Sequence, residues 1–338
     1  MRILFIKLRH IGDSLLLTPT IAATKQKYPH AEIWVLVRES CDGILAGCPE
    51  IDRILTTANP DAAKRTKLGW LSDLKLATLL RRTPFDFVFE LTDNDRARFL
   101  ALAAHTPMRC TNEHRTLKKF WRPFFHRVST ASRRRQHQVV RDYLCPQAVL
   151  QLAENTPGLV FRKDKMVPWT AQSLPEKFCV IHMHTRWERK SWPIERWEEL
   201  IAGLLLIIPK IVLSCGPGNV ERKQSLALAE KFGDQVGSTL GNANWAELAW
   251  LLDHAAFFVG VDTAAMHLAA AVNCPSVVLF GPSPVHEYHP WKARHWMLRP
   301  QEWLGEEAAS RIPKDKLMTE IPVNRVLAAC REALAVGH

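Results

Sequence analysis

Residues 257–282 read FFVGVDTAAMHLAAAVNCPSVVLFGP, and this stretch decides the fold class. Its pattern predicts a buried strand over 257–261, a helix over 263–272 and a second buried strand over 276–280. An apolar strand that leads through a helix to another apolar strand is typical of a parallel sheet covered by helices. The stretch therefore predicts an α/β fold.

The turn between the first strand and the helix has the features of an anion site. Asp262 stands where it can cap the helix, so the backbone N–H groups of Thr263, Ala264 and Ala265 would face outward. Such a helix end attracts phosphates, and His267, one turn further on, can add a hydrogen bond or a positive charge. The alternative is an ordinary strand and helix with a structural cap and a buried histidine.

The same alternation runs along the rest of the chain. It predicts strands over 2–8, 32–37, 85–90, 178–183 and 211–214, and helices over 15–28, 71–82, 96–105, 137–152, 194–206, 220–232 and 244–252. Two doubly wound halves in series follow from this order, joined by a linker at 155–175 that is rich in proline and glycine.

A length of 338 residues is more than one core usually supports, and 47% hydrophobic residues suffice for two. We expect an N-terminal domain over 1–165, a C-terminal domain over 166–321 and a closing helix within 322–338 that packs back on the first domain. The apolar run Ile3–Ile6 is far too short for a signal sequence or a membrane span, and the eight cysteines form no Cys-x-x-Cys pair. A cytoplasmic protein with reduced cysteines is the expectation.

Positive charge is concentrated in the first half of the chain. Residues 1–165 hold 28 Lys and Arg against 16 Asp and Glu, so the rest of the 45 and 34 nearly balance. A basic segment over 109–135 carries most of the excess, with Phe120, Trp121, Phe124 and Phe125 between its cations. The candidates for binding an acidic acceptor there are Arg115, Lys118, Lys119, Arg122, Arg133, Arg134 and Arg135.

Three roles are open for the basic segment. Its cations and aromatic rings suit the surface of a membrane with anionic headgroups. A patch of this kind can also bind nucleic acid. A solvated loop that only improves solubility is the third possibility.

The turn after the first strand, Lys7–Ser14, carries a carboxylate. Gly12 permits a tight turn at the carboxyl edge of the sheet, where ligands bind in open α/β folds, so Asp13 would face the cleft. A carboxylate in that position can take a proton from an attacking hydroxyl group. Alternatively, Asp13 only caps the helix that follows.

The segment after the strand at 178–183 offers cations for a diphosphate. Thr185, Arg186 and Lys190 can donate hydrogen bonds and neutralise the charge that grows on a leaving group. His182 and His184 alternate to one face, but no further ligand stands at a usable spacing, so we expect no metal.

A glycine turn, Ser214–Glu221, follows the next strand. Its Gly-x-Gly is a weak dinucleotide signal, because no third glycine follows at the spacing of NAD-binding folds. An NAD-dependent oxidoreductase is disfavoured because the first half of the chain lacks the glycine fingerprint and the acidic residue that would bind a ribose. Glu221 also fits a plain loop in which its charge complements the helix dipole.

Three of these motifs together resemble glycosyltransferase family 9, the ADP-heptose:lipopolysaccharide heptosyltransferases. They are the run from Asp262 to Ala270, the Ile-Gly-Asp turn that ends at Asp13, and Lys190-Ser191-Trp192-Pro193. The run departs from the family pattern at Ala264, where glycine is usual. Within the family, the Val-Asp-Thr-Ala-Ala-Met-His variant and the Ser-Cys-Gly-Pro turn lean toward the transferases of the third, branching heptose.

The resemblance implies a GT-B fold, in which two Rossmann-like domains face each other across a cleft. It implies Asp13 as the catalytic base and Glu221 near the ribose of the donor. The donor-binding residues would be Thr185, Arg186, Lys190, Glu221, Asp262, Thr263, Ala264 and His267.

The activity that the resemblance implies is transfer of L-glycero-D-manno-heptose from ADP-heptose to the inner core of lipopolysaccharide. The transfer would invert the anomeric centre and use neither a metal nor a cofactor. The enzyme would work in the cytoplasm, peripherally on the inner leaflet of the inner membrane, with no nucleic-acid partner. Two alternatives stay open: a nucleic-acid-binding protein that uses residues 109–135, and a GT-B transferase for another nucleoside-diphosphate sugar.

Overall fold

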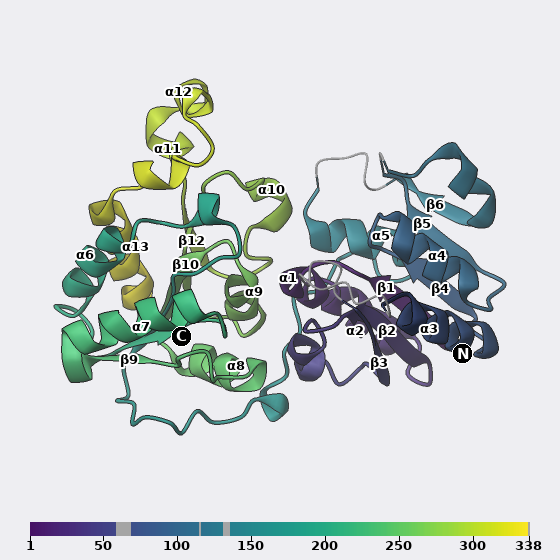
Figure 1. The fold of residues 1–338 in the computed structure, drawn as a ribbon, viewed down its shortest axis with the longest axis horizontal. Coiled ribbons are helices and arrows are strands. Elements are labelled where there is room, and N and C mark those ends of the chain that lie inside the picture. Colours follow the sequence, from purple (N-terminus) through teal and green to yellow (C-terminus); the bar gives the residue numbers. More distant parts are fainter. Residues whose placement is uncertain (59–68, 115, 131–135, 337–338) are drawn as a thin grey trace. The chain divides into compact units, whose positions relative to one another are not determined.

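The computed structural model describes residues 1–58, 69–114, 116–130 and 136–336. The chain divides into two compact units, Met1–Val160 (unit 1) and Phe161–His338 (unit 2), where the sequence predicted a division after residue 165. Figure 1 shows unit 1 in purple to blue and unit 2 in green to yellow, each with a sheet flanked by helices.

Unit 1 is built on a six-stranded sheet in the order β3-β2-β1-β4-β5-β6, with all neighbours parallel. Its strands are β1 (Arg2–Lys7), β2 (Glu32–Arg38), β3 (Arg53–Thr57), β4 (Phe87–Glu90), β5 (Arg109–Asn112) and β6 (Arg127–Ser129). The central strands β1 and β2 are buried on both faces, which is why they are continuous apolar runs.

The helices of unit 1 cover both faces of this sheet. They are α1 (Ile11–Leu15), α2 (Thr18–Lys27), α3 (Gly69–Arg82), α4 (Asp95–Ala103) and α5 (Gln138–Leu150), with α2 packed beside α5 and α3 beside α4. The expected helix over 15–28 is therefore wrong in its first part. A helix already begins at Ile11, because the carboxylate of Asp13 accepts the backbone N–H of His10. Pro19 then starts the second helix, so Gly12 lies in a helix and not in a tight turn.

Unit 2 has a second six-stranded parallel sheet, in the order β12-β11-β10-β7-β8-β9. Its strands are β7 (Cys179–His182), β8 (Ile211–Ser214), β9 (Val236–Ser238), β10 (Phe257–Val261), β11 (Ser276–Leu279) and β12 (His295–Leu298). Together with the sheet of unit 1, this confirms the predicted α/β class with two doubly wound halves.

The helices of unit 2 are α6 (Ile194–Leu204), α7 (Asn219–Phe232), α8 (Trp245–His254), α9 (Ala264–Ala271), α10 (Val285–Tyr288), α11 (Gln301–Leu304), α12 (Glu306–Arg311) and α13 (Val323–Val336). The closing helix α13 packs on α6 and on β10, β11 and β12, which are elements of its own unit. Val326, Cys330 and Ala333 from this helix are fully buried in the core of unit 2.

Five strands were missed in the sequence: β3, β5, β6, β9 and β12. They are three to five residues long and lie on the outer positions of the two sheets. Several of them carry polar residues, as in the RCTN of β5, so they lack the apolar run that reveals a central strand. In its described parts the basic segment contains β5, a short 3-10 helix over Lys119–Phe124 and β6, where the sequence showed poor periodicity.

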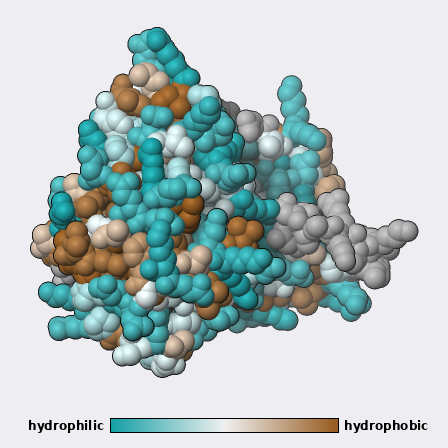
Figure 2. Space-filling model, turned by 60° about the vertical axis from the view of Figure 1, so that its left-hand side comes forward, coloured by the Kyte–Doolittle hydropathy of each residue, from teal (hydrophilic) through white to brown (hydrophobic). Residues whose placement is uncertain are grey.

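No helix among the described residues is both long and apolar enough to cross a membrane. The face drawn in Figure 2 carries hydrophilic residues (teal) with smaller areas of hydrophobic residues (brown) between them.

Candidate functional site

Each sheet has a point where the strand order reverses. In unit 2 this point lies between β7 and β10, and in unit 1 between β1 and β4, because the chain winds outward in opposite directions from these pairs. Ligands of open α/β sheets bind at the carboxyl ends of the strands beside such a point. The segments that follow β1, β7 and β10 carry the residues that the sequence singled out, Asp13 in unit 1 and Lys190 and Asp262 in unit 2.

In unit 2, the loops after β7 and β10 are joined by an ion pair. The ammonium group of Lys190 lies 2.6 Å from the carboxylate of Asp262, and both side chains are largely buried. The expected cap by Asp262 is wrong: Thr263 is the N-cap residue, without a side-chain cap bond, because the carboxylate of Asp262 is engaged by Lys190. A cation thus stands next to the open N-terminus of α9, an arrangement suited to a phosphate.

The first turn of α9 begins at Ala264 and leads to His267. His267 is buried one turn into the helix, and its backbone N–H donates to the carbonyl oxygen of Thr263. The hydroxyl oxygen of Thr263 is itself buried and has no hydrogen-bond partner within the described part of the chain. A donor group is thus available where the sequence placed the phosphate. Contact between His267 and a phosphate stays a prediction.

The end of β7 and the loop after it hold two histidines, and the loop holds two of the predicted donor ligands. Nδ1 of His182 lies 2.9 Å from the hydroxyl oxygen of Ser214, and Nε2 of His184 lies 3.0 Å from Oε1 of Gln224. Burial lowers the pKa of both histidines, that of His182 to about 3, so His182 is neutral at physiological pH. Among the described residues no group of three or more potential metal ligands comes together.

Thr185 is half-buried in that loop and Arg186 is exposed. Glu221 has a structural partner, because its carboxylate accepts the backbone N–H of Gly216 at 2.6 Å and so closes the glycine turn before α7. Gly241 supports the same turn: its φ is +66°, and a Cβ there would lie 2.4 Å from the carbonyl oxygen of Gly216. The predicted contact of Glu221 with a ribose stays a prediction.

In unit 1, the contacts of Asp13 bear out its interpretation as a helix cap, and its role as a base stays a prediction. One carboxylate oxygen accepts the backbone N–H of His10 at 3.3 Å, which caps α1. The other oxygen is buried and has no hydrogen-bond partner among the described residues, and the whole residue is only 8% exposed. Buried acceptors are normally paired, so this oxygen is the expected place for a donor hydroxyl group from a ligand.

Unit 1 also contains a buried ionic cluster, whose members were not among the predicted site residues. Lys7 donates to both carboxylate oxygens of Asp142 at 2.8 and 2.6 Å, and the guanidinium of Arg98 lies 3.7 Å from Glu90. These four side chains are fully buried. The signal in the sequence was a charged residue at the end of an otherwise apolar strand, Lys7 in β1 and Glu90 in β4.

The cluster makes stability depend on pH. Burial raises the pKa of Glu90 from 4.5 to about 7 and that of Asp142 from 3.8 to about 6. The folded state then keeps protons that the unfolded state releases, so stability should fall as pH rises from about 4 to 7 and level off above that. Between about pH 6 and 7 mainly Glu90 contributes. We expect Glu90→Gln to remove most of the decline in this window in urea unfolding of the full chain, and an unchanged slope would contradict the assignment.

The described part of the basic segment is partly structural. Arg109 at the start of β5 donates to the carbonyl oxygens of Ala101, Phe124 and Ala104, so it is not a surface cation. Arg122 pairs with Glu113, while Lys118 and Lys119 are exposed. Of the predicted acceptor ligands, Arg115, Arg133, Arg134 and Arg135 lie outside the described residues.

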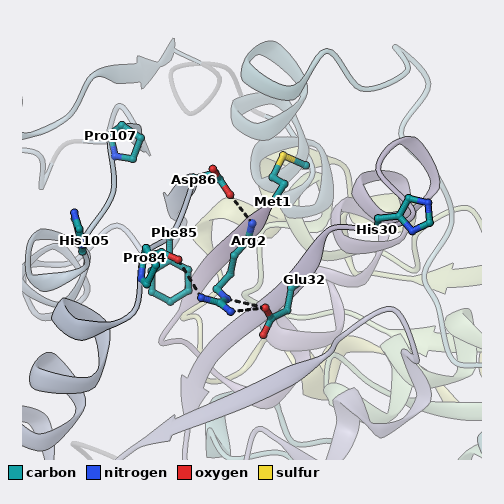
Figure 3. Close-up of a pocket in the computed structure, with 9 residues that line it drawn as sticks. All are labelled: Met1, Arg2, His30, Glu32, Pro84, Phe85, Asp86, His105 and Pro107. Atoms are coloured by element: carbon teal, nitrogen blue, oxygen red, sulfur yellow. Dashed lines mark hydrogen bonds and ion pairs between the residues drawn. The ribbon is translucent and has the colours of Figure 1, made fainter.

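A cavity of about 490 Å³ lies at the opposite edge of the sheet of unit 1 (Figure 3). In this close-up Arg2 reaches from β1 to Glu32 on β2, at 2.7 Å, and its backbone N–H donates to Asp86 at 2.6 Å. These residues stand at the amino ends of their strands, away from the edge where ligands bind in this class of fold. The cavity is held together by its own ion pair and is not the candidate site.

The chain is similar to known proteins over most of its length. Residues 74–316 match the family model described as glycosyltransferase family 9 (heptosyltransferase). The chain is 28% identical to lipopolysaccharide heptosyltransferase 3 of Escherichia coli, over 97% of each chain. It is 25% identical to lipopolysaccharide heptosyltransferase 1 of Salmonella typhimurium, over 84% of this chain and 89% of the relative.

Solved structures show the same fold. The glycosyl transferase family 9 protein from Veillonella parvula superposes with a TM-score of 0.82 at 20% identity, over 99% of this chain and 98% of that one. The E. coli heptosyltransferase WaaC with ADP-2-deoxy-2-fluoro heptose gives a TM-score of 0.78 at 22% identity, over 98% and 99%.

Proposed function

The chain belongs to glycosyltransferase family 9, the heptosyltransferases, and from that premise we propose that it transfers heptose from ADP-heptose to the inner core of lipopolysaccharide. Similarity over 97% of both chains to a lipopolysaccharide heptosyltransferase supports the donor and the acceptor. The higher identity to heptosyltransferase 3 than to heptosyltransferase 1 supports a branching heptose as the product.

The donor belongs to unit 2 in this proposal. The diphosphate of ADP-heptose would lie at the N-terminus of α9, against the backbone of Thr263 and Ala264 and the ammonium group of Lys190. His267, Thr185 and Arg186 would complete the phosphate ligands, and Glu221 would hold the ribose. Lys190 and the helix end would stabilise the negative charge on the departing ADP, as a divalent metal does in other transferases.

The acceptor reacts at Asp13 of unit 1. Asp13 removes the proton from the acceptor hydroxyl group while its oxygen attacks the anomeric carbon of the heptose. The bond from that carbon to the diphosphate breaks, and ADP leaves with the electron pair. A single displacement inverts the anomeric centre and needs one base and no covalent nucleophile. The unpaired buried oxygen of Asp13 is the observation that carries this assignment.

A donor screen tests the function directly. The full-length protein is incubated with a truncated lipopolysaccharide acceptor and with ADP-heptose, ADP-glucose or UDP-glucose, and the products are weighed by mass spectrometry. We expect a mass increase of one heptose from ADP-heptose only. Transfer from another sugar nucleotide but not from ADP-heptose would assign a different donor. Thermal stabilisation by single-stranded or duplex nucleic acid but not by ADP, with a steep salt dependence, would favour the nucleic-acid alternative.

A surface of unit 1 supports peripheral attachment to the cytoplasmic face of the inner membrane. Phe99 on α4 is 62% exposed, and Phe120 and Phe124 on the adjacent turn are also exposed. All three rings pack around the buried Trp121, whose indole N–H donates to Asp95. We call the three exposed rings the aromatic patch. The patch is bordered by three cations, Lys118, Lys119 and Arg122. The rings can insert among lipid headgroups while the cations are attracted to the negative charge of those headgroups.

We expect the double substitution Phe99→Ser and Phe124→Ser to weaken binding to vesicles with anionic lipids about tenfold, because two rings no longer leave water. Co-sedimentation with vesicles that contain phosphatidylglycerol measures this. Leu206→Ser is the matched control, since Leu206 is exposed but belongs to unit 2. Equal losses in both variants, or none in either, would contradict a membrane role of the aromatic patch.

A further inference from the structure

Asp93 has an unusual environment at the reversal point of unit 1. It lies three residues after the end of β4, is only 3% exposed and has a φ of +64°. Left-handed backbone is uncommon for residues other than glycine, and it concentrates at ligand sites. The burial and backbone of Asp93 therefore suggest that its carboxylate has a functional role.

One oxygen of that carboxylate is bound and the other is not. Oδ2 accepts a hydrogen bond from Arg141 at 3.2 Å and lies 3.6 Å from the guanidinium of Arg9. Oδ1 is buried and has no hydrogen-bond partner among the described residues. A buried acceptor without a donor is rare in folded proteins and costs free energy unless a ligand supplies the donor.

The neighbouring buried carboxylates show the contrast. Glu90 accepts from the backbone N–H groups of Thr92 and Asp93 and from the hydroxyl group of Thr111. Asp142 accepts from Lys7 with both oxygens and from Gln138 with one. These two side chains are satisfied by the protein, so they serve the fold, whereas Asp93 keeps one acceptor open.

Asp93 and Asp13 come from adjacent loops at the same edge of the sheet. The backbone N–H of Leu8 donates to the hydroxyl oxygen of Thr92 at 2.8 Å, and Arg9 donates to the carbonyl oxygen of Thr92 at 3.0 Å. The loop that leads to Asp13 is thus fastened to the loop that carries Asp93. Both loops hold a buried carboxylate with one oxygen that lacks a donor.

We propose that Asp93 binds a hydroxyl group of the acceptor sugar next to the one that Asp13 deprotonates. This inference rests on the proposed transferase function. The ligand is a neutral sugar hydroxyl and not a phosphate or carboxylate of the acceptor, because an anion would be repelled by Oδ1. Arg141 is a positioning residue, since it holds Oδ2 and through it the direction of the carboxylate.

The test uses acceptor sugars that each lack one hydroxyl group. Transfer of heptose at saturating ADP-heptose is measured for the wild type and for Asp93→Asn, in which asparagine keeps the size and tolerates the left-handed backbone. We expect one deoxy acceptor to lose about tenfold in kcat/KM with the wild type, because a buried acceptor goes unpaired, and less than about twofold with Asp93→Asn. With the complete acceptor, Asp93→Asn should raise the KM of the acceptor and leave the KM of ADP-heptose unchanged.

Asp142→Asn is the matched control, because it removes a charge from the same cluster at a carboxylate that the protein already satisfies. It should lower thermal stability and leave the preference among deoxy acceptors as in the wild type. The inference is overturned if Asp93→Asn keeps the wild-type preference, or if Asp142→Asn loses it equally. If the wild type transfers no heptose to any acceptor, the proposed function itself fails. If the wild type transfers heptose but Asp93→Asn keeps its preference, only the inference about Asp93 fails.

Discussion

Asp13→Asn is expected to lower turnover by about 10²- to 10⁴-fold, the range that a positioned general base contributes. Asparagine keeps the size of the side chain and can still accept the backbone N–H of His10, so α1 keeps its cap. What it loses is the ability to take a proton with the oxygen that now lacks a partner. The affinity for ADP should stay near the wild-type value, because we propose that unit 2 holds the donor.

Steady-state kinetics and calorimetry with ADP separate these effects. Glu39→Gln is the control, an exposed acidic residue after β2 in the same unit, and it should change neither quantity. If Asp13→Asn loses ADP affinity as strongly as turnover, Asp13 belongs to the donor site and the assigned role is wrong. A turnover near that of the wild type would make the helix cap its whole function.

The sequence predicted the central strands of both sheets well and their outer strands poorly, for one physical reason. β10 and β8 have the bounds that were expected, because strands buried on both faces must be continuous apolar runs. β5 and β6 lie near a sheet edge and each begins with an arginine, of which Arg109 donates to neighbouring carbonyl oxygens. Their identity depends on pairing with neighbours distant in the sequence, which a local pattern does not contain.

The candidate site also has features that the local sequence predicts and features that depend on contacts between distant residues. Lys190 and Asp262 were singled out from separate motifs, and the structure joins them at 2.6 Å. The cap expected from Asp262 was wrong because local spacing could not reveal that a lysine 72 residues earlier takes its carboxylate. Nothing in the local sequence marks Asp93, because its left-handed backbone and its unpaired oxygen exist only in the folded chain.

Lys190→Ala should have the largest effect on the donor. It removes a cation next to the N-terminus of α9 and leaves the buried carboxylate of Asp262 facing the diphosphate without compensation. A charge-assisted hydrogen bond of this kind corresponds to about 10- to 150-fold in affinity, and we expect a loss in that range for ADP, together with slower turnover. Isothermal calorimetry with ADP measures the first effect. Lys231→Ala, which breaks an exposed ion pair with Glu198 in the same unit, is the control and should change neither.

The double variant Lys190→Ala and Asp262→Asn decides between two reasons for such a loss. If Lys190 acts only by neutralising Asp262, removing both charges should restore most of the ADP affinity. If Lys190 binds the diphosphate itself, as we propose, the double variant should stay weak, because the phosphate has still lost its cation. Recovery to within about twofold of the wild type would therefore place the pair in the structural scaffold of unit 2 and move the diphosphate away from Lys190.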